Sequence, residues 1–211
     1  EREIELMAEA GKILERVHNE LEKALRPGMS TKDVDTLGEE IIRSYGCIPS
    51  FLNYNGYPAS ICVSVNQEVV HGIPDKHRII QEGDIVSLDA GVIYKGYHSD
   101  AARTHAVGEV SEEAKKLIQV TKESFFEGIK FAKAGNHLFD ISGAIGRYAE
   151  ERGYGVVRDL CGHGIGTALH EAPEIPNYEV GRKGVRLRPG MTLAIEPMIN
   201  IGTHEVDWLD D

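Results

Sequence analysis

The sequence lacks any apolar run that could cross a membrane. A transmembrane helix needs about 18 or more consecutive apolar residues, and no stretch of the 211 residues approaches that length. The first ten residues, EREIELMAEA, also lack the basic start and apolar middle of a signal peptide. We therefore predict a protein that makes no membrane contact and acts in the cytoplasm.

Cysteine and positive charge are also scarce. Cys47, Cys62 and Cys161 are odd in number and lack metal-finger spacing, which favours buried thiols in a reducing compartment over a disulfide framework. The 34 acidic residues outnumber the 23 basic ones, and the formal net charge is −11. An acidic surface repels phosphate, so the composition argues against a nucleic-acid substrate.

The length suits one domain with a single large core or two small repeats. A shift of 107 residues supports the repeat, because it aligns several glycines and two acids in constant register. We therefore interpret residues 1–211 as one catalytic domain built from halves 1–107 and 108–211, with the aligned acids meeting between them. The aligned pairs are Pro27 with Ala134, Gly46 with Gly153, Gly83 with Gly190, and Asp89 with Glu196.

Apolar residues at helical spacing predict four helices, at 2–25, 30–45, 111–133 and 138–152. Ser30 and Asp33 form a capping pattern at the start of the second helix. The apolar positions of the third helix are Leu117, Ile118, Phe125, Ile129 and Phe131. Between the helix pairs, ICVSVNQEVVHGIP reads as an alternating strand that follows an aromatic turn.

Residues 83–106 carry two acids in what we predict to be a β-hairpin. Ser87 and Asp89 fall on one face of an alternating strand, and a turn is indicated around Lys95 and Gly96. The returning arm brings Asp100 opposite Asp89 or within a rung or two of it. Two like charges so placed repel each other unless a cation lies between them. The hairpin therefore predicts a metal site.

Four further polar residues stand among apolar or glycine neighbours: His71 in VVHGIP, His163 in CGHGIG, His170 in ALHEAP and Glu196 in LAIEPM. Taken alone, each histidine reads as a hydrogen-bonded core or loop residue, and Glu196 before Pro197 as a strand end. Together they point to a site. The glycines at 162, 164 and 166 lack the following helix of a phosphate cradle, so we interpret them as allowing close backbone approach around His163.

The motifs VVHGIP, SLDAG, HSDAART, CGHGIG, LHEAP and AIEPM, in this order and spacing, resemble those of type I methionine aminopeptidases over essentially the whole chain. The resemblance implies an α+β pita-bread (creatinase/aminopeptidase) fold, with two pseudo-twofold-related halves of helices and antiparallel strands. It also implies metal-dependent hydrolysis of the N-terminal methionine from proteins and peptides whose second residue is small. The compact spacing from His163 to Glu196 matches type I, without the helical insertion of type II.

By position, the resemblance makes Asp89, Asp100, His163 and Glu196 the metal ligands, with Asp100 bridging two divalent ions. This ligand set suits Co, Mn, Fe or Zn without choosing among them. A water held by two ions would be acidified near neutral pH and attack the peptide carbonyl.

The resemblance further assigns three catalytic residues and a substrate pocket. Glu196 would relay a proton, His170 would stabilise the oxyanion, and His71 would contact the scissile nitrogen. The methionine side chain would lie in an apolar wall. The substrate-binding residues implied are Phe51, Tyr54, Tyr57, Cys62, His71, Leu169 and His170.

The implied partners are the N-terminal methionine of nascent polypeptides and, transiently, the ribosome, with the enzyme acting as a monomer. Two rivals stay open: a proline-cleaving pita-bread peptidase, and a catalytically silent binding module of the same fold. Comparing activity on Met-Ala peptides with activity on Xaa-Pro peptides would distinguish a methionine aminopeptidase from the proline-cleaving rival.

The family's pattern has one more bridging Glu, in a motif S-A-Q-x-E-H well beyond Glu196. The remaining acids here, Glu205, Asp207, Asp210 and Asp211, lie in no such motif. We therefore expect a C-terminally truncated chain that holds one ion tightly or none and is impaired as a peptidase, whereas its full-length parent is active.

Overall fold

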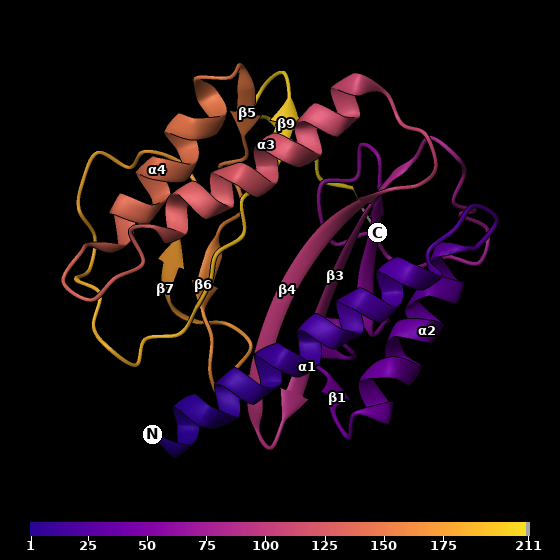
Figure 1. The fold of residues 1–211 in the computed structure, drawn as a ribbon, viewed down its shortest axis with the longest axis horizontal. Coiled ribbons are helices and arrows are strands. Elements are labelled where there is room, and N and C mark those ends of the chain that lie inside the picture. The colour runs from indigo at the N-terminus through magenta and orange to yellow at the C-terminus, as the bar shows by residue number, and fades with distance from the viewer. Residues whose placement is uncertain (210–211) are drawn as a thin grey trace. The chain divides into compact units, whose positions relative to one another are not determined.

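The computed structural model describes residues 1–209, so Asp210 and Asp211 lie outside the described residues. The chain folds into two compact units (Figure 1). The first comprises residues 1–114 together with 165–170, and the second comprises 115–164 together with the chain from 171 onward. Neither unit is one continuous stretch, and the division into halves 1–107 and 108–211 stays a prediction. Among residues 1–209, no helix combines the length and apolar character that a membrane crossing requires.

The first unit contains two helices and an antiparallel sheet. Both β1 and β2 pair with β3, and β4 pairs with β3 as the second arm of the hairpin. The elements are α1 (Arg2–Ala24), α2 (Thr31–Ser44), β1 (Ile48–Pro49), the 3-10 helix η1 (Tyr54–Gly56), β2 (Ile61–Val65), β3 (Ile85–Tyr94) and β4 (Tyr97–Ala106).

Local sequence signals set the ends of these elements. The Ser30 side chain accepts a hydrogen bond from the Asp33 N–H, and the Asp33 side chain accepts one from the Ser30 N–H, which completes the expected capping box of α2. Between β3 and β4 the two turn residues, Lys95 and Gly96, both have positive φ. This is the backbone of a tight two-residue hairpin turn, and it holds the two long strands in register.

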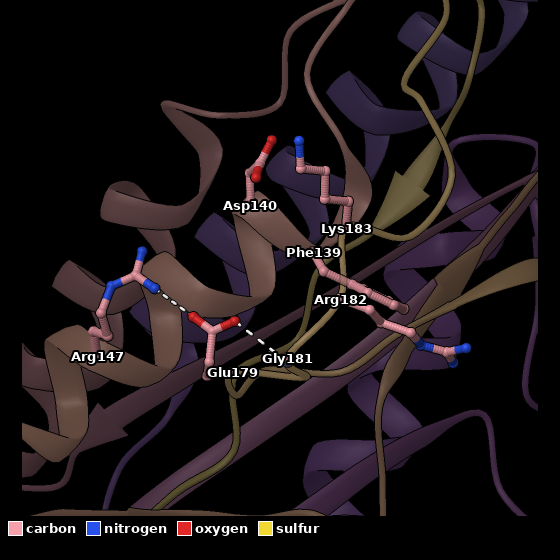
Figure 2. A pocket seen from close by; sticks show the side chains of 7 residues that line it. All are labelled: Phe139, Asp140, Arg147, Glu179, Gly181, Arg182 and Lys183. Atoms are coloured by element: carbon pink, nitrogen blue, oxygen red, sulfur yellow. Dashed lines mark hydrogen bonds and ion pairs between the residues drawn. The ribbon is translucent and has the colours of Figure 1, made fainter.

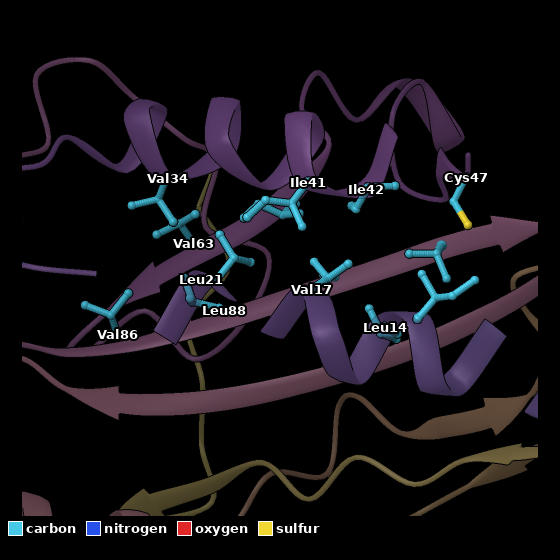
Figure 3. Close-up of a cluster of buried hydrophobic side chains, with 14 of the residues drawn as sticks. Leu14, Val17, Leu21, Val34, Ile41, Ile42, Cys47, Val63, Val86 and Leu88 are labelled. Carbon is cyan, nitrogen blue, oxygen red and sulfur yellow. The ribbon is translucent and has the colours of Figure 1, made fainter. Parts of the chain in front are cut away.

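The core of the first unit lies between its two helices and one face of the sheet. Leu14, Val17 and Leu21 of α1 point toward the strands, as do the apolar residues of α2 (Figure 3). On β3 partly exposed and buried residues alternate from Ile85 to Ala90, and Val86 and Leu88 are fully buried in this core. The intervening residues, Asp89 among them, therefore project from the other face.

The expected alternating strand after the aromatic turn is wrong in extent and pattern. Strand β2 ends at Val65, and all five of its residues are buried. Its start is held by Asp35 of α2, a buried carboxylate that accepts hydrogen bonds from the N–H groups of Ser60 and Ile61 at 2.8 and 3.1 Å. Helix α2 packs against β2, and no residue of the strand faces solvent. A strand buried on both faces shows no alternation of apolar and polar residues, so periodicity alone could not reveal it.

A fully buried histidine, His18, lies in the apolar face of α1. Its Nε2 is 2.8 Å from the carbonyl oxygen of Ala101 on β4. Since a carbonyl only accepts, Nε2 carries the proton and donates it. Burial lowers the pKa of His18 from 6.5 to about 4, with Arg103 and His105 lowering it further, while the bond to Ala101 and the Asp100 carboxylate oppose the shift. The ring is neutral at pH 7.

Acid is therefore expected to destabilise the protein partly through His18. The unfolded chain takes up this proton below about pH 6.5, but the folded protein does so only near pH 4. Stability contributed by the neutral ring is thus complete above pH 6.5 and is lost as the pH falls toward 4. The loss amounts to about 3 kcal/mol in the free energy of unfolding. Urea unfolding of metal-free protein at pH 7 and 4.5 measures it, and His18→Leu should show a clearly smaller loss. Equal losses in both proteins would contradict this account.

The second unit contains most of α3 (Glu112–Ile129) and all of α4 (Leu138–Glu150), with short antiparallel strands. Strand β6 pairs with both β7 and β8, and β5 pairs with β9. The strands are β5 (Tyr154–Val156), β6 (Gly162–Gly164), β7 (Glu171–Ile175), β8 (Leu193–Ala194) and β9 (Ile199–Ile201).

The prediction for α3 is wrong at its end, and the most deeply buried residues of the helix are not the apolar ones that the sequence singled out. The helix stops at Ile129, and Phe131 beyond it is 39% exposed. The other four apolar residues are half-buried, and the fully buried positions are Val120, Ser124 and Gly128. A Cβ at Gly128 would come within 2.5 Å of Ile145 on α4, so the two helices approach each other over small residues. Counting apolar residues overlooked this face because glycine and serine do not register as hydrophobic.

Several local features recur in the two units at the shift of 107 residues. His137 and Asp140 repeat the capping box at the start of α4. Isolated bridges join Ser30 to Ile79 and His137 to Arg186, again 107 apart. The pairing of Ile48 with Ile93 is matched by that of Gly155 with Asn200. Within this register, Asp89 on β3 corresponds to Glu196 between β8 and β9.

Candidate active site

The hairpin of the first unit brings two acids together. Asp89 pairs with Ala102 and Asp100 pairs with Gly91, so the two carboxylates are diagonal neighbours on one face of the sheet. One oxygen of each carboxylate is buried. A Cβ at Gly91 would lie 2.7 Å from Cβ of Ser50, so glycine is required at this rung. This strand register is the one expected from the sequence, and it brings the two acidic side chains close together at a partly buried position.

In the second unit, His163 lies beside Glu196. His163 is buried on β6, and its Nδ1 donates to the carbonyl oxygen of Gly164 at 2.8 Å. This bond places the lone pair on Nε2, which lies 3.7 Å from Oε1 of Glu196. The backbone of Glu196 is held in turn, because its carbonyl accepts a hydrogen bond from the buried Asn177 side chain at 2.8 Å.

The glycines around His163 allow close backbone packing. A Cβ at Gly162 would lie 2.3 Å from the carbonyl oxygen of Ala194, and one at Gly164 would lie 2.3 Å from that of Ala172. Both contacts are far shorter than van der Waals separation, so β6 accepts only glycine at these positions. The expected role of these two glycines agrees with this geometry.

These side chains have the chemistry that a divalent cation requires. A carboxylate pair in the first unit and an imidazole with a carboxylate in the second provide oxygen and nitrogen donors. The Nδ1 bond of His163 to a backbone carbonyl is the outer contact by which metal-binding histidines are commonly oriented. Each unit therefore offers donors of the kinds that bind a divalent metal, and such donors are the ones that metal-dependent hydrolases use.

His71 lies in the loop after β2, where it has a left-handed φ of 59°. The next residue, Gly72, packs so tightly that a Cβ would lie 2.4 Å from the Val63 carbonyl oxygen. The Gly72 N–H also donates to Oγ of Ser64 at 3.0 Å. Desolvation lowers the pKa of His71, and the Asp100 carboxylate opposes the shift. The imidazole is therefore within electrostatic reach of this acid.

Two predicted pocket residues, Tyr57 and Cys62, adjoin each other. The Tyr57 hydroxyl lies 3.1 Å from the carbonyl oxygens of Ile61 and Gly72, to which it donates. Tyr57 thereby ties the aromatic turn to the His71 loop. Burial and the Asp89 carboxylate raise the pKa of Cys62, so this thiol stays protonated at neutral pH.

Three other predicted residues, Tyr54, Leu169 and His170, lie together at the end of segment 165–170. Nδ1 of His170 lies 2.8 Å from the Tyr54 hydroxyl, and the two ring centroids are 5.2 Å apart. Leu169 beside His170 is buried, and so is Phe51 at the start of the aromatic turn. The segment 165–170 is attached to this unit by a backbone hydrogen bond from His98 to Gly166.

Sequence reasoning missed the residues that hold this site in place. Gly72, next to His71, and the Asn177 side chain both act through backbone contacts, and Tyr57 was expected as a pocket wall but not as a donor to the backbone. Only Gly72 left a signal, as a glycine directly after a candidate catalytic histidine. All three cysteines are free thiols, as expected, although Cys161 is only partly buried.

A surface cavity of about 330 Å³ lies elsewhere, near the start of α4 (Figure 2). Its wall is charged, and Arg147 and Glu179 form an ion pair across it. None of the predicted catalytic, metal-binding or substrate-binding residues lines it. It is therefore separate from the site described above.

The fold and the donor set together define a metallopeptidase, and the comparison with known families agrees. The chain belongs to metallopeptidase family M24, whose model matches residues 5–210. The expected pita-bread architecture of helices and antiparallel strands is confirmed by solved structures of this family.

Similar proteins are methionine aminopeptidases. The chain is 57% identical to that of Clostridium acetobutylicum over 211 residues, which covers 98% of this chain and 84% of the relative. The structure of methionine aminopeptidase from Thermotoga maritima has a TM-score of 0.96 and 46% identity, covering 99% of this chain and 84% of that one. The Xaa-Pro dipeptidase of Bacillus anthracis has a TM-score of 0.80 and 32% identity, with 93% and 53% covered.

Proposed function

We propose that this protein removes the N-terminal methionine from proteins and peptides by metal-dependent hydrolysis. The observation that carries the proposal is the similarity to methionine aminopeptidases at 57% identity across nearly the whole chain. The geometry agrees with it, because a buried histidine and partly buried acids of ligand type are held in place by strand pairing and by hydrogen bonds to the backbone. The protein is accordingly a hydrolase and a metallo-exopeptidase.

The proline-cleaving alternative is less well supported. This chain spans 53% of the Xaa-Pro dipeptidase, against 84% of the methionine aminopeptidases, and its identity to the dipeptidase is lower. Both kinds of relative share the fold, so the distinction lies in the substrate pocket. We assign that pocket to Phe51, Tyr54, Tyr57, Cys62 and Leu169, with a small second residue in the substrate.

Asp89, Asp100, His163 and Glu196 would hold divalent ions. When bound, such ions polarise the scissile carbonyl and lower the pKa of a water molecule to near neutrality. The donor types suit Co, Mn, Fe or Zn without choosing among them. The carboxylates set the geometry because their strands are paired in a fixed register.

The remaining polar residues handle protons and charge. Glu196 takes a proton from the attacking water and passes it to the departing amine. His170, oriented by the Tyr54 hydroxyl, donates a hydrogen bond to the oxyanion. His71, held by the tightly packed Gly72, contacts the scissile nitrogen.

The proposal also covers the protein's setting. Three free cysteines agree with a reducing compartment, so we place the enzyme in the cytoplasm. There it would act as a monomer on nascent polypeptides, transiently near the ribosome.

The test compares Met-Ala-Ser, Leu-Ala-Ser and Ala-Pro-Ser peptides, with Mn²⁺ or Co²⁺ added and with chelator. Metal-dependent release of methionine from the first peptide alone is the expected result. Release from the proline peptide would favour the dipeptidase, and binding of the Met peptide with no cleavage in any metal would favour a silent binding module. Tyr57→Ala should reduce the preference for Met over Leu, since it removes a wall of the pocket.

A further inference from the structure

Strand β4 carries Asp100, and outside its ladder with β3 the described residues give it a single backbone–backbone hydrogen bond, from His98 to Gly166. Among residues 1–209 its ladder partner is β3, and helix α1 lies along the hairpin on the face opposite the two acids (Figure 1). An edge strand held by a single ladder is easier to displace than a central one. The two acids add to this tendency, because like charges on adjoining strands repel.

The hydrogen bond from His18 reaches β4 at the point where the acids meet. It ends on the carbonyl oxygen of Ala101, at 2.8 Å. This carbonyl belongs to the peptide between Ala101, which follows Asp100, and Ala102, which pairs with Asp89. This peptide therefore adjoins Asp100 along the strand and faces Asp89 across the ladder, so a contact here bears on the separation of the two carboxylates.

The chemistry of His18 is costly for a position that only fills space. The ring is fully buried, and within the described chain its Nδ1 has no hydrogen-bond partner. An unpaired polar atom in a core reduces stability by about 1–3 kcal/mol. A leucine would fill the same helix face without that penalty. The one polar interaction that the ring makes through Nε2 is therefore the feature that requires an explanation.

We propose that His18 is a positioning residue that clamps the Ala101–Ala102 peptide and so fixes the spacing of Asp89 and Asp100 for a divalent cation. The inference deepens the proposed function, on which its metal site rests. Metal ligands must lie within a few tenths of an ångström of their required positions. A buried donor on a long, rigid helix resists the outward movement of β4 that carboxylate repulsion favours when no ion is bound. The site is then preorganised before the ion arrives.

The decisive variant is His18→Leu, which keeps an apolar volume and removes the donor. We expect its affinity for Co²⁺ to fall about tenfold, as is common when an outer contact of a metal site is lost. The absorption spectrum of bound Co²⁺ and calorimetric titration with Mn²⁺ both measure this in the full chain. At saturating metal, KM for a Met peptide should stay near the wild-type value. His18→Gln, which retains an N–H donor, should recover part of the affinity.

The matched control is Val17→Ala, one residue earlier in the same core. It should lower the free energy of unfolding by removing buried methyl groups, yet leave metal affinity unchanged. The inference is overturned if His18→Leu binds metal like the wild type, if Val17→Ala weakens binding equally, or if the wild type binds no divalent ion. Should His18→Leu not fold, His18→Met takes its place. A wild type that binds metal but cleaves no Met peptide would refute the proposed function and leave the clamp intact.

Discussion

Replacing Asp100 with asparagine is expected to lower kcat/KM for a Met-Ala peptide by on the order of 10³-fold or more, a loss at least as large as that of one oriented donor in an active site. The amide is isosteric with the carboxylate but carries no charge, so the β4 backbone and its pairing with Gly91 should persist. What is lost is half of the carboxylate pair on the hairpin face. Bound metal should fall with activity, because the two losses share one cause.

The matched control for Asp100→Asn is Asp84→Asn. Asp84 precedes the same hairpin, but its side chain accepts hydrogen bonds from Gln81 and Asn66 at the turn. The Asp84→Asn variant should retain both bound metal and activity. Metal content by mass spectrometry, initial rates and urea unfolding together check the prediction. An Asp100→Asn protein that keeps full metal and wild-type rates would remove Asp100 from the site.

Substituting His170 or His71 by alanine is expected to reduce turnover by about 10² to 10³-fold while metal content stays unchanged. Both histidines lie in the first unit, and each is positioned by neighbours other than the predicted metal ligands. Nδ1 of His170 is oriented by the Tyr54 hydroxyl, and His71 is fixed by the strained backbone beside Gly72. The expected loss is one hydrogen bond that strengthens in the transition state, so kcat should fall more than KM rises.

Tyr54→Phe gives a milder test of the same mechanism. It removes the hydroxyl that orients His170 and keeps the aromatic ring, so a loss of about tenfold in kcat is expected. The contrary result for the histidines is specific: a variant that loses its metal and regains activity in excess metal would identify that histidine as a ligand.

The hairpin shows how much local sequence can determine. Strict alternation from Val86 to Leu88 sends one set of side chains into the core and leaves Asp89 on the other face. The Lys95–Gly96 turn then fixes the return, which puts Asp100 two rungs away. Period-two burial and turn geometry are properties of neighbouring residues, so the carboxylate pair follows from the amino-acid order alone.

Non-local packing escaped this reasoning. The burial of all five β2 residues depends in part on α2, which packs against the strand, and the packed face of α3 depends on Ile145 meeting Gly128. A short apolar run or a glycine carries no record of its distant partner. For the same reason the segment 165–170 could not be assigned to the first unit, since a bond from His98 attaches it there.

The sequence by itself therefore determined the motifs, the family they indicate, the capping boxes and the hairpin register, because each depends on residue identity at short spacing. Only the tertiary structure decided what holds those residues in place. His18 in a helical apolar stripe is indistinguishable from any core histidine until Ala101, 83 positions away in sequence, is found at its Nε2. Side chains that donate to a backbone carbonyl need no particular partner residue, so their partners leave no pattern in the sequence and emerge only when the chain folds.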